Sequence, residues 1–147
     1  HDGEFCGNGI LFADHSPTPR MQEVKYLYQG FATVITRQDF TVTNRMLFTS
    51  TAAYECVVTV AQEGRVLDSA EVATDVAPGA SGTFPLPFEV PAGPGEYAVE
   101  VSYRLRADTN WASAGDEVGW EQAVFGAWEP ARLSAARRAW CVASTTL

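Results

Sequence analysis

A strict alternation of apolar and polar side chains in the middle of the chain limits what this sequence can fold into. The clearest example is residues 97–106, where every second position is apolar. Successive side chains of an extended strand point to opposite faces of a sheet, so this spacing gives the strand one buried face and one solvent-exposed face. The apolar set is Tyr97, Val99, Val101, Tyr103 and Leu105; the polar set is Glu100, Ser102, Arg104 and Arg106. The pattern predicts a half-buried strand.

Two neighbouring segments predict a hairpin. Residues 54–60 alternate in the same way, and Glu63-Gly64 follows them before residues 65–72. Glycine adopts a positive φ at little cost, so this pair offers a tight reversal between two antiparallel strands.

Residues 84–90 also alternate, but Pro85 and Pro87 interrupt them. Proline has no backbone N–H to donate to a neighbouring strand. We therefore expect this segment to be an edge strand.

The remaining strand candidates are short and separated by turn residues. Pro78-Gly79 and Pro94-Gly95 are strong turn signals. Seven or more short antiparallel strands without a long helical period favour an all-β fold, an immunoglobulin/fibronectin-III-like antiparallel β-sandwich with an irregular N-terminal segment. The further candidates are residues 24–29, 32–35, 40–44, 47–50 and 118–125.

The two ends of the chain differ from its middle. Residues 1–20 are rich in Gly, Asp and Pro, and Pro17 and Pro19 are typical of a linker before the first strand. Residues 21–128 form the predicted sandwich, and residues 129–147 are expected to be a tail or linker, with a weak helical pattern after Pro130.

Composition excludes several classes of partner. The 147 residues carry a net charge of −8, with eighteen acids against ten bases, which opposes binding to nucleic acid or an anionic membrane surface. The chain has no apolar run long enough to span a membrane. Its three cysteines, Cys6, Cys56 and Cys141, fit neither a disulfide framework nor a zinc site, so we expect reduced thiols in a cytoplasmic protein. The polar opening HDGEF indicates an internal cut rather than a signal peptide.

The usual catalytic motifs are not found. The two histidines, His1 and His15, belong to no recognisable motif, and there is no GxSxG sequence. No glycine-rich stretch matches a P-loop or a dinucleotide fingerprint. The adjacent acids Asp116-Glu117 are interpreted as a solvated turn.

Three tryptophans, Trp111, Trp120 and Trp128, leave two interpretations open. They could form a platform on which sugar rings stack, as in a carbohydrate-binding module. Alternatively, they are buried in the core or anchor an interface with another domain. Exposure of the rings on one flat face would distinguish these alternatives.

Several motifs in the same order resemble the large β-galactosidases of glycoside hydrolase family 2. EFCGNGILFADHSPTPRMQEVKYLYQ, at residues 4–29, is similar to the junction between the catalytic barrel and the following domain in that family. TDVAP, PGEYAVEVSYRLR and WASAGDEVGWEQ follow at residues 74–78, 94–106 and 111–122. The resemblance covers about residues 2–126. Asp116 stands where the family pattern has histidine, and His15 stands where it has arginine.

The resemblance implies a site at the start of the chain. It assigns the Phe5 backbone carbonyl and the Asn8 side-chain oxygen to a sodium ion beside the galactose subsite, with the Phe5 ring flanking the sugar. Sodium and magnesium are expected cofactors of the parent family. Two donors are fewer than the roughly six oxygens that a hard cation takes, so we expect no useful sodium affinity in this chain alone.

The resemblance also implies that both catalytic glutamates lie upstream of His1, so we expect no catalytic residue here and no hydrolysis by the chain alone. The expected role is architectural: the sandwich packs against the upstream barrel and links it to the downstream C-terminal domain. The parent enzyme would hydrolyse terminal β-D-galactosides such as lactose in carbohydrate metabolism. The alternatives are a carbohydrate-binding module and a small stand-alone enzyme, which would need a concave site with a perturbed carboxylate or histidine.

Overall fold

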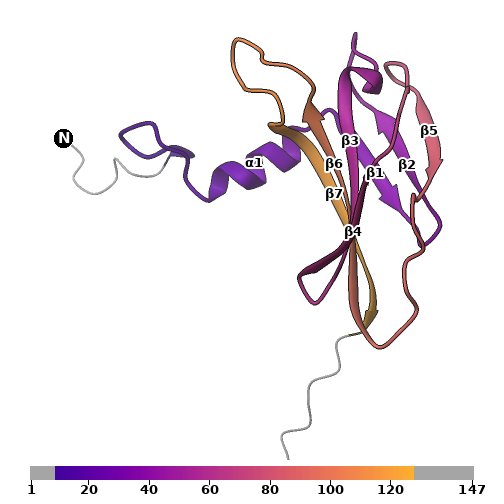
Figure 1. The fold of residues 1–147 in the computed structure, drawn as a ribbon. Coiled ribbons are helices and arrows are strands. Elements are labelled where there is room, and N and C mark those ends of the chain that lie inside the picture. The colour runs from indigo at the N-terminus through magenta and orange to yellow at the C-terminus, as the bar shows by residue number, and fades with distance from the viewer. Residues whose placement is uncertain (1–8, 128–147) are drawn as a thin grey trace, which may run out of the picture.

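Two antiparallel sheets face each other in the structure, a computed structural model that describes residues 9–127 (Figure 1). One sheet has the order β1-β2-β5 and the other has the order β4-β3-β6-β7. A single α-helix, α1, precedes the first strand, and a 3-10 turn precedes β3. The bounds are α1 Arg20–Tyr28, β1 Phe31–Ile35, β2 Asp39–Asn44, Thr51–Ala53 (3-10), β3 Tyr54–Gln62, β4 Arg65–Glu71, β5 Ser81–Pro85, β6 Gly95–Leu105 and β7 Glu117–Ala127.

The core lies between the two sheets and is built from the alternating apolar positions. Every second residue of β2, β3 and β6 points inward, while the residues between them face outward. The predicted all-β sandwich of two sheets is therefore confirmed. The inward set on these strands is Phe40, Val42, Cys56, Val58, Val60, Tyr97, Val99, Val101 and Tyr103.

The longest predicted strands are also confirmed. β6 and β7 pair along almost their whole length, and β3 pairs with β6 on the other side. The predicted hairpin joins β3 to β4 through Glu63 and Gly64, whose φ angles of 49° and 78° are both positive. Positive φ at both central positions suits a two-residue turn between twisted strands.

The strand predicted at residues 24–29 is wrong, because this segment belongs to helix α1. The alternation of Val24, Tyr26 and Tyr28 imitates a strand, but the segment belongs to neither sheet. Met, Gln, Glu, Lys and Leu in RMQEVKYLY are good helix formers, so local propensity decides the structure. No residue of α1 is buried.

The strand predicted at residues 47–50 is also wrong, because these residues form a loop. The buried side chain of Asn44 organises the loop: its Nδ2 donates to Thr49 O at 2.8 Å, and its Oδ1 accepts from Met46 N at 2.9 Å. Leu47 and Phe48 point into solvent. The side-chain amide of Asn44 thus makes hydrogen bonds with backbone groups of this loop, which belongs to neither sheet.

The prediction of an edge strand is confirmed, but its range is wrong, because only Phe84 and Pro85 of residues 84–90 belong to β5. β5 ends at Pro85 and pairs with β2, so it lies at the edge of its sheet. The Leu86 N–H still donates to Gln38 O at 2.9 Å, after which the chain leaves the sheet at Pro87. The missing donors of the two prolines account for this early end.

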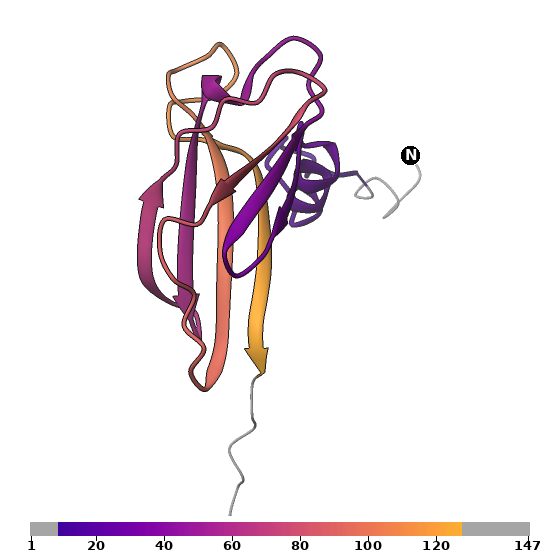
Figure 2. The same cartoon turned by 90° about the vertical axis from the view of Figure 1, so that its right-hand side faces the viewer.

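Helix α1 lies outside the sandwich, beside β7 (Figure 1). The view turned by 90° shows the two layers and the loop between β6 and β7 at one end of the sandwich, while β7 ends at the other (Figure 2). Within residues 9–127, no helix is both long and apolar enough to cross a membrane.

Candidate functional site

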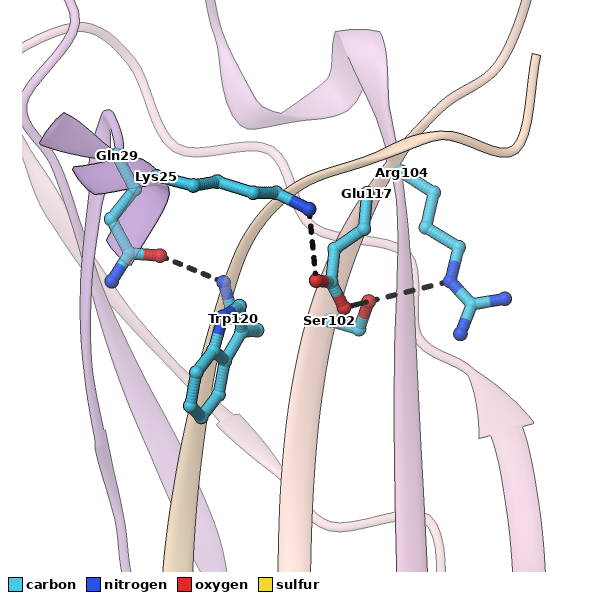
Figure 3. A network of polar contacts seen from close by, with 6 residues as sticks. All are labelled: Lys25, Gln29, Ser102, Arg104, Glu117 and Trp120. Carbon is cyan, nitrogen blue, oxygen red and sulfur yellow. Dashed lines mark hydrogen bonds and ion pairs between the residues drawn. The ribbon is translucent and has the colours of Figure 1, made fainter. Parts of the chain in front are cut away.

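A set of polar contacts joins α1 and the residue after it to β7. β7 is the last strand of the four-stranded sheet, so one side of it has no strand partner in that sheet. The backbone N–H of Trp120 donates to Gln29 Oε1 at 2.7 Å, as Figure 3 shows. A side chain just after α1 thus satisfies a backbone donor on an edge strand, which would otherwise stay open to another chain.

Aromatic and hydroxyl contacts reinforce this junction. The rings of Tyr26 and Trp120 lie 5.1 Å apart and are tilted by 46°. The Tyr26 hydroxyl donates to Glu121 Oε2 at 2.9 Å, and this hydrogen bond raises the pKa of Tyr26 above its ordinary value. Trp120 and Glu121 are neighbours on β7, so a single helical side chain contacts both.

An ion pair and two hydrogen bonds extend from α1 across the outer face of the sheet (Figure 3). Lys25 Nζ lies 3.2 Å from Glu117 Oε1. The other oxygen of Glu117 accepts from the buried Ser102 hydroxyl at 2.7 Å, and Ser102 Oγ accepts from Arg104 Nε at 3.3 Å. Both carboxylate oxygens of Glu117 therefore have partners.

A local irregularity between β6 and β7 sets the position of Glu117. The register shifts between Tyr103 and Arg104, so that Arg104 lies opposite Glu117 while Ser102 lies opposite Trp120. A β-bulge of this kind re-aims a side chain without breaking the strand. It places Glu117 on the outer face together with Ser102, within reach of α1.

Glu100 lies next to this network on the same outer face. Burial raises the pKa of its carboxyl, and the charge of Glu117 adds to the effect, while Arg104 opposes it. Val99 and Val101 on either side of Glu100 point into the core. The Glu100 carboxyl therefore faces outward from the sheet.

A hollow of about 640 Å³ separates α1 from the loop that joins β6 to β7. It is lined by Pro17, Gln22, Lys25, Trp111, Asp116 and Glu117, among others. A second, smaller hollow lies on the other side of α1, beside Leu27 and Arg45.

The tryptophans do not share a flat exposed face in the described part of the chain. Trp120 is partly covered by Tyr26, whereas Trp111 projects from the β6–β7 loop with 69% of its surface exposed. Trp128 lies outside the described residues. Trp120 is therefore an anchor for α1 rather than an open stacking ring.

The residues that the sequence assigned to a sodium site, Phe5 and Asn8, lie outside the described residues, so their role stays a prediction. Across residues 9–127, no group of three or more His, Cys, Asp and Glu side chains is placed to hold a metal ion. No sequence motif singled out Lys25, Tyr26 and Gln29. Their helical spacing would have placed them on one side of a helix, but the segment was interpreted as a strand.

Comparison with known proteins agrees with the motifs. A family model described as "Beta-galactosidase, domain 4" matches residues 40–126. A second, described as "Glycosyl hydrolases family 2, TIM barrel domain", matches residues 1–33. The junction therefore joins α1, in the barrel match, to β7, in the domain 4 match.

Curated relatives are similar over most of the chain. A β-galactosidase of Streptococcus thermophilus is 41% identical over 117 residues, which are 80% of this chain and 11% of that protein. A β-galactosidase of Priestia megaterium is 39% identical over 132 residues, 85% of this chain and 13% of that protein. The β-galactosidase BgaC of Bifidobacterium adolescentis is 36% identical over 126 residues, 84% of this chain and 12% of that protein. The chain thus spans about one eighth of the length of these relatives.

Proposed function

The chain belongs to the β-galactosidase domain 4 family of glycosyl hydrolase family 2, and we propose that it is a non-catalytic structural domain that holds the catalytic barrel of a longer enzyme in place. The observation that carries this proposal is the junction between α1 and β7. The barrel-matched helix is attached to the sandwich through Lys25, Tyr26 and Gln29. These contacts would hold the end of the barrel against the sandwich.

The second half of the proposal is that the sandwich also links the barrel to the domain that follows. Contacts with α1 are made by Glu117, Trp120 and Glu121, near the start of β7. The strand then runs to Ala127 at the other end of the sandwich (Figure 2). A neighbour after Ala127 would thus be kept apart from the barrel by the length of the sandwich.

For the longer enzyme, we propose hydrolysis of terminal β-D-galactosides such as lactose, as part of carbohydrate metabolism. The support is that the similar curated proteins are named β-galactosidases. Retaining glycoside hydrolysis uses two carboxyl groups about 5–5.5 Å apart. We propose that this pair comes from the barrel upstream of the chain and that the sandwich contributes no reacting group.

The sodium site is a separate proposal. In the longer enzyme, Phe5 through its backbone carbonyl and Asn8 through its side-chain oxygen would supply two of the donors. Carbonyl and amide oxygens suit a hard cation, which supports the assignment. Sodium and magnesium remain the cofactors that we expect for the parent enzyme, and a cytoplasmic location remains a prediction.

The test is hydrolysis of a chromogenic β-galactoside by the 147-residue chain and by a longer protein that includes the upstream barrel. We expect release of the chromophore only by the longer protein. Turnover by the 147-residue chain alone would overturn the structural role and direct attention back to its own carboxylates.

A further inference from the structure

Exposed apolar side chains are concentrated in the segment that enters the sandwich. Ile10, Leu11, Phe12, Leu27 and Tyr28 are all exposed, and all lie within the region matched by the barrel model. Several exposed apolar side chains in one short segment are a sign of an interaction site. This segment therefore carries surface that the sandwich itself does not cover.

Helix α1 has two different sides. Lys25 and Tyr26, with Gln29 just beyond the helix, contact β7, whereas the next two helical positions, Leu27 and Tyr28, are 66% and 85% exposed. Leu27 borders the smaller hollow beside β1, whereas Tyr28, about 100° further around the helix, leaves 85% of its surface exposed. The helix thus presents polar contacts to β7 and apolar side chains to another partner.

The β6–β7 loop carries Trp111 beside this helix, across the hollow described above. The loop is held by its own hydrogen bonds: Thr109 N donates to Ala112 O at 2.8 Å, and Ala114 N donates to Asp108 Oδ1 at 2.8 Å. An exposed indole on a pre-formed loop loses little conformational entropy when it is covered, which suits an interface anchor.

The charge of the hollow restricts what can fill it. Lys25 already pairs with Glu117, while Asp116 uses Oδ2 to accept from Ser113 N at 3.0 Å and forms no ion pair within the described residues. An indole face next to a carboxylate suits a cationic side chain, which can stack on the ring and pair with the acid.

From these observations we propose that the upstream barrel docks on this end of the sandwich, covering Tyr28 and Trp111. An arginine or lysine of the barrel enters the hollow between Trp111 and Asp116. The surface is continuous with the α1–β7 junction, and α1 itself lies in the barrel-matched region, which identifies the barrel as the occupant. This inference rests on the proposed structural role and names the contact surface of that role.

Hydroxyl-radical footprinting with mass spectrometry tests the proposal without any substitution. We expect Trp111 and Tyr28 to be modified severalfold more slowly in the longer protein than in the 147-residue chain. Val66 and Leu67 on β4, which are exposed outside this surface, serve as internal controls and should react equally in both. Equal reactivity of Trp111 in the two proteins would overturn the docking surface.

Two substitutions test the energetic contribution of the hollow. Because Trp111 and Asp116 are exposed in the chain, Trp111→Ala and Asp116→Asn should leave its melting temperature nearly unchanged. In the longer protein both should lower the melting temperature, whereas the matched changes Leu67→Ala and Asp68→Asn should not. The docking surface would be contradicted if Trp111→Ala and Asp116→Asn lowered the melting temperature equally in the 147-residue chain and in the longer protein, or lowered it in neither.

The hydrolysis assay separates this inference from the proposed function. An active longer protein with an unprotected Trp111 would refute the docking surface and leave the function intact. An inactive longer protein with a protected Trp111 would refute the hydrolytic function while the docking surface stands.

Discussion

Lys25 Nζ lies 3.2 Å from Glu117 Oε1, an ion pair that joins α1 to the first residue of β7. Both side chains are about one-third exposed, so water screens the pair, and ion pairs in such settings contribute about 0–1 kcal/mol. Helix α1 buries no residue completely. Polar contacts and the Tyr26–Trp120 ring contact therefore determine where α1 lies, although the exposed ion pair adds little to the stability of the sandwich.

Substitution Glu117→Gln should loosen α1 without unfolding the sandwich. The amide keeps an oxygen that can accept from Ser102 but loses the charge that attracts Lys25. We expect the free energy of unfolding to fall by less than about 1 kcal/mol, while the Trp120 amide, which Gln29 protects, exchanges its hydrogen faster. Urea denaturation and native-state hydrogen exchange measure the two effects.

Glu71→Gln is the matched control, because it breaks the exposed ion pair between Glu71 on β4 and Arg106, the residue that follows β6. It should change stability by a similar small amount without affecting the Trp120 amide. Faster exchange at Trp120 in both variants would mean that α1 is not held by the Lys25 pair.

Substitution Tyr103→Phe should destabilise the core through one hydroxyl. Tyr103 OH lies 3.3 Å from Thr33 Oγ1, and both side chains are buried where the two sheets meet. Removing one partner leaves a buried hydroxyl unsatisfied, which costs about 1–3 kcal/mol. Thermal denaturation of Tyr103→Phe, of Thr33→Val and of the double variant gives a double-mutant cycle for this hydrogen bond. The double variant should lose less than the sum of the two single losses, and strict additivity would argue against a direct interaction.

Stability should decrease at alkaline pH because of Cys56. Burial raises the pKa of its thiol from 9.0 to about 12. A raised pKa in the folded state means that stability is complete below pH 9 and is lost as the pH rises toward 12, by about 1.4 kcal/mol per pH unit. Burial raises the pKa of Tyr103 in the same direction, and its contribution begins above pH 10. Urea midpoints between pH 7 and 11 measure the slope, which Cys56→Ala should reduce but not abolish.

The same burial predicts how Cys56 reacts. In a variant whose Cys6 and Cys141 are replaced by serine, the Cys56 thiol should resist a disulfide reagent at pH 8 and react at once in urea, because only unfolding exposes the thiolate. Rapid reaction without denaturant would show that this part of the core opens readily.

Two glycines on or beside β7 should respond differently to substitution by alanine. Gly115 and Gly126 have φ angles of 86° and 91°, in which an L side chain costs roughly 1–2 kcal/mol. A Cβ at Gly115 meets nothing nearby, whereas a Cβ at Gly126 would collide with the backbone carbonyl of Gly95. Urea denaturation should show that Gly126→Ala is clearly the more destabilising change. Equal losses would mean that the backbone there shifts freely.

The sandwich strands were predictable because their signal is local. Alternation identified β6, and the positive-φ preference of Gly64 identified the β3–β4 turn, with no knowledge of the tertiary structure. Helix α1 was missed because the alternation of Val24, Tyr26 and Tyr28 was given more weight than the helix-forming residues of RMQEVKYLY. The loop at residues 47–50 was missed because the side chain that shapes it, Asn44, lies outside the segment.

The junction was beyond sequence reasoning for a different reason. Lys25 and Glu117 are 92 positions apart, and the register shift near Arg104 that aligns Glu117 has no signature in the sequence. The apolar nature of Trp111 was visible, but its exposure depends on a loop whose hydrogen bonds are set only after β6 and β7 pair. The junction thus depends on contacts between elements that are far apart in the sequence, which the alternation within a single segment does not reveal.

The position of β7 also constrains how such a domain can diverge. Its eleven residues rise by about 35 Å between the contact with α1 and the point where the chain leaves the sandwich. Adding one residue within this strand would reverse the faces of all later side chains, and adding two would lengthen the strand by about 7 Å. Insertions should therefore accumulate in turns such as Glu63-Gly64, while the number of residues in β7 should stay constant.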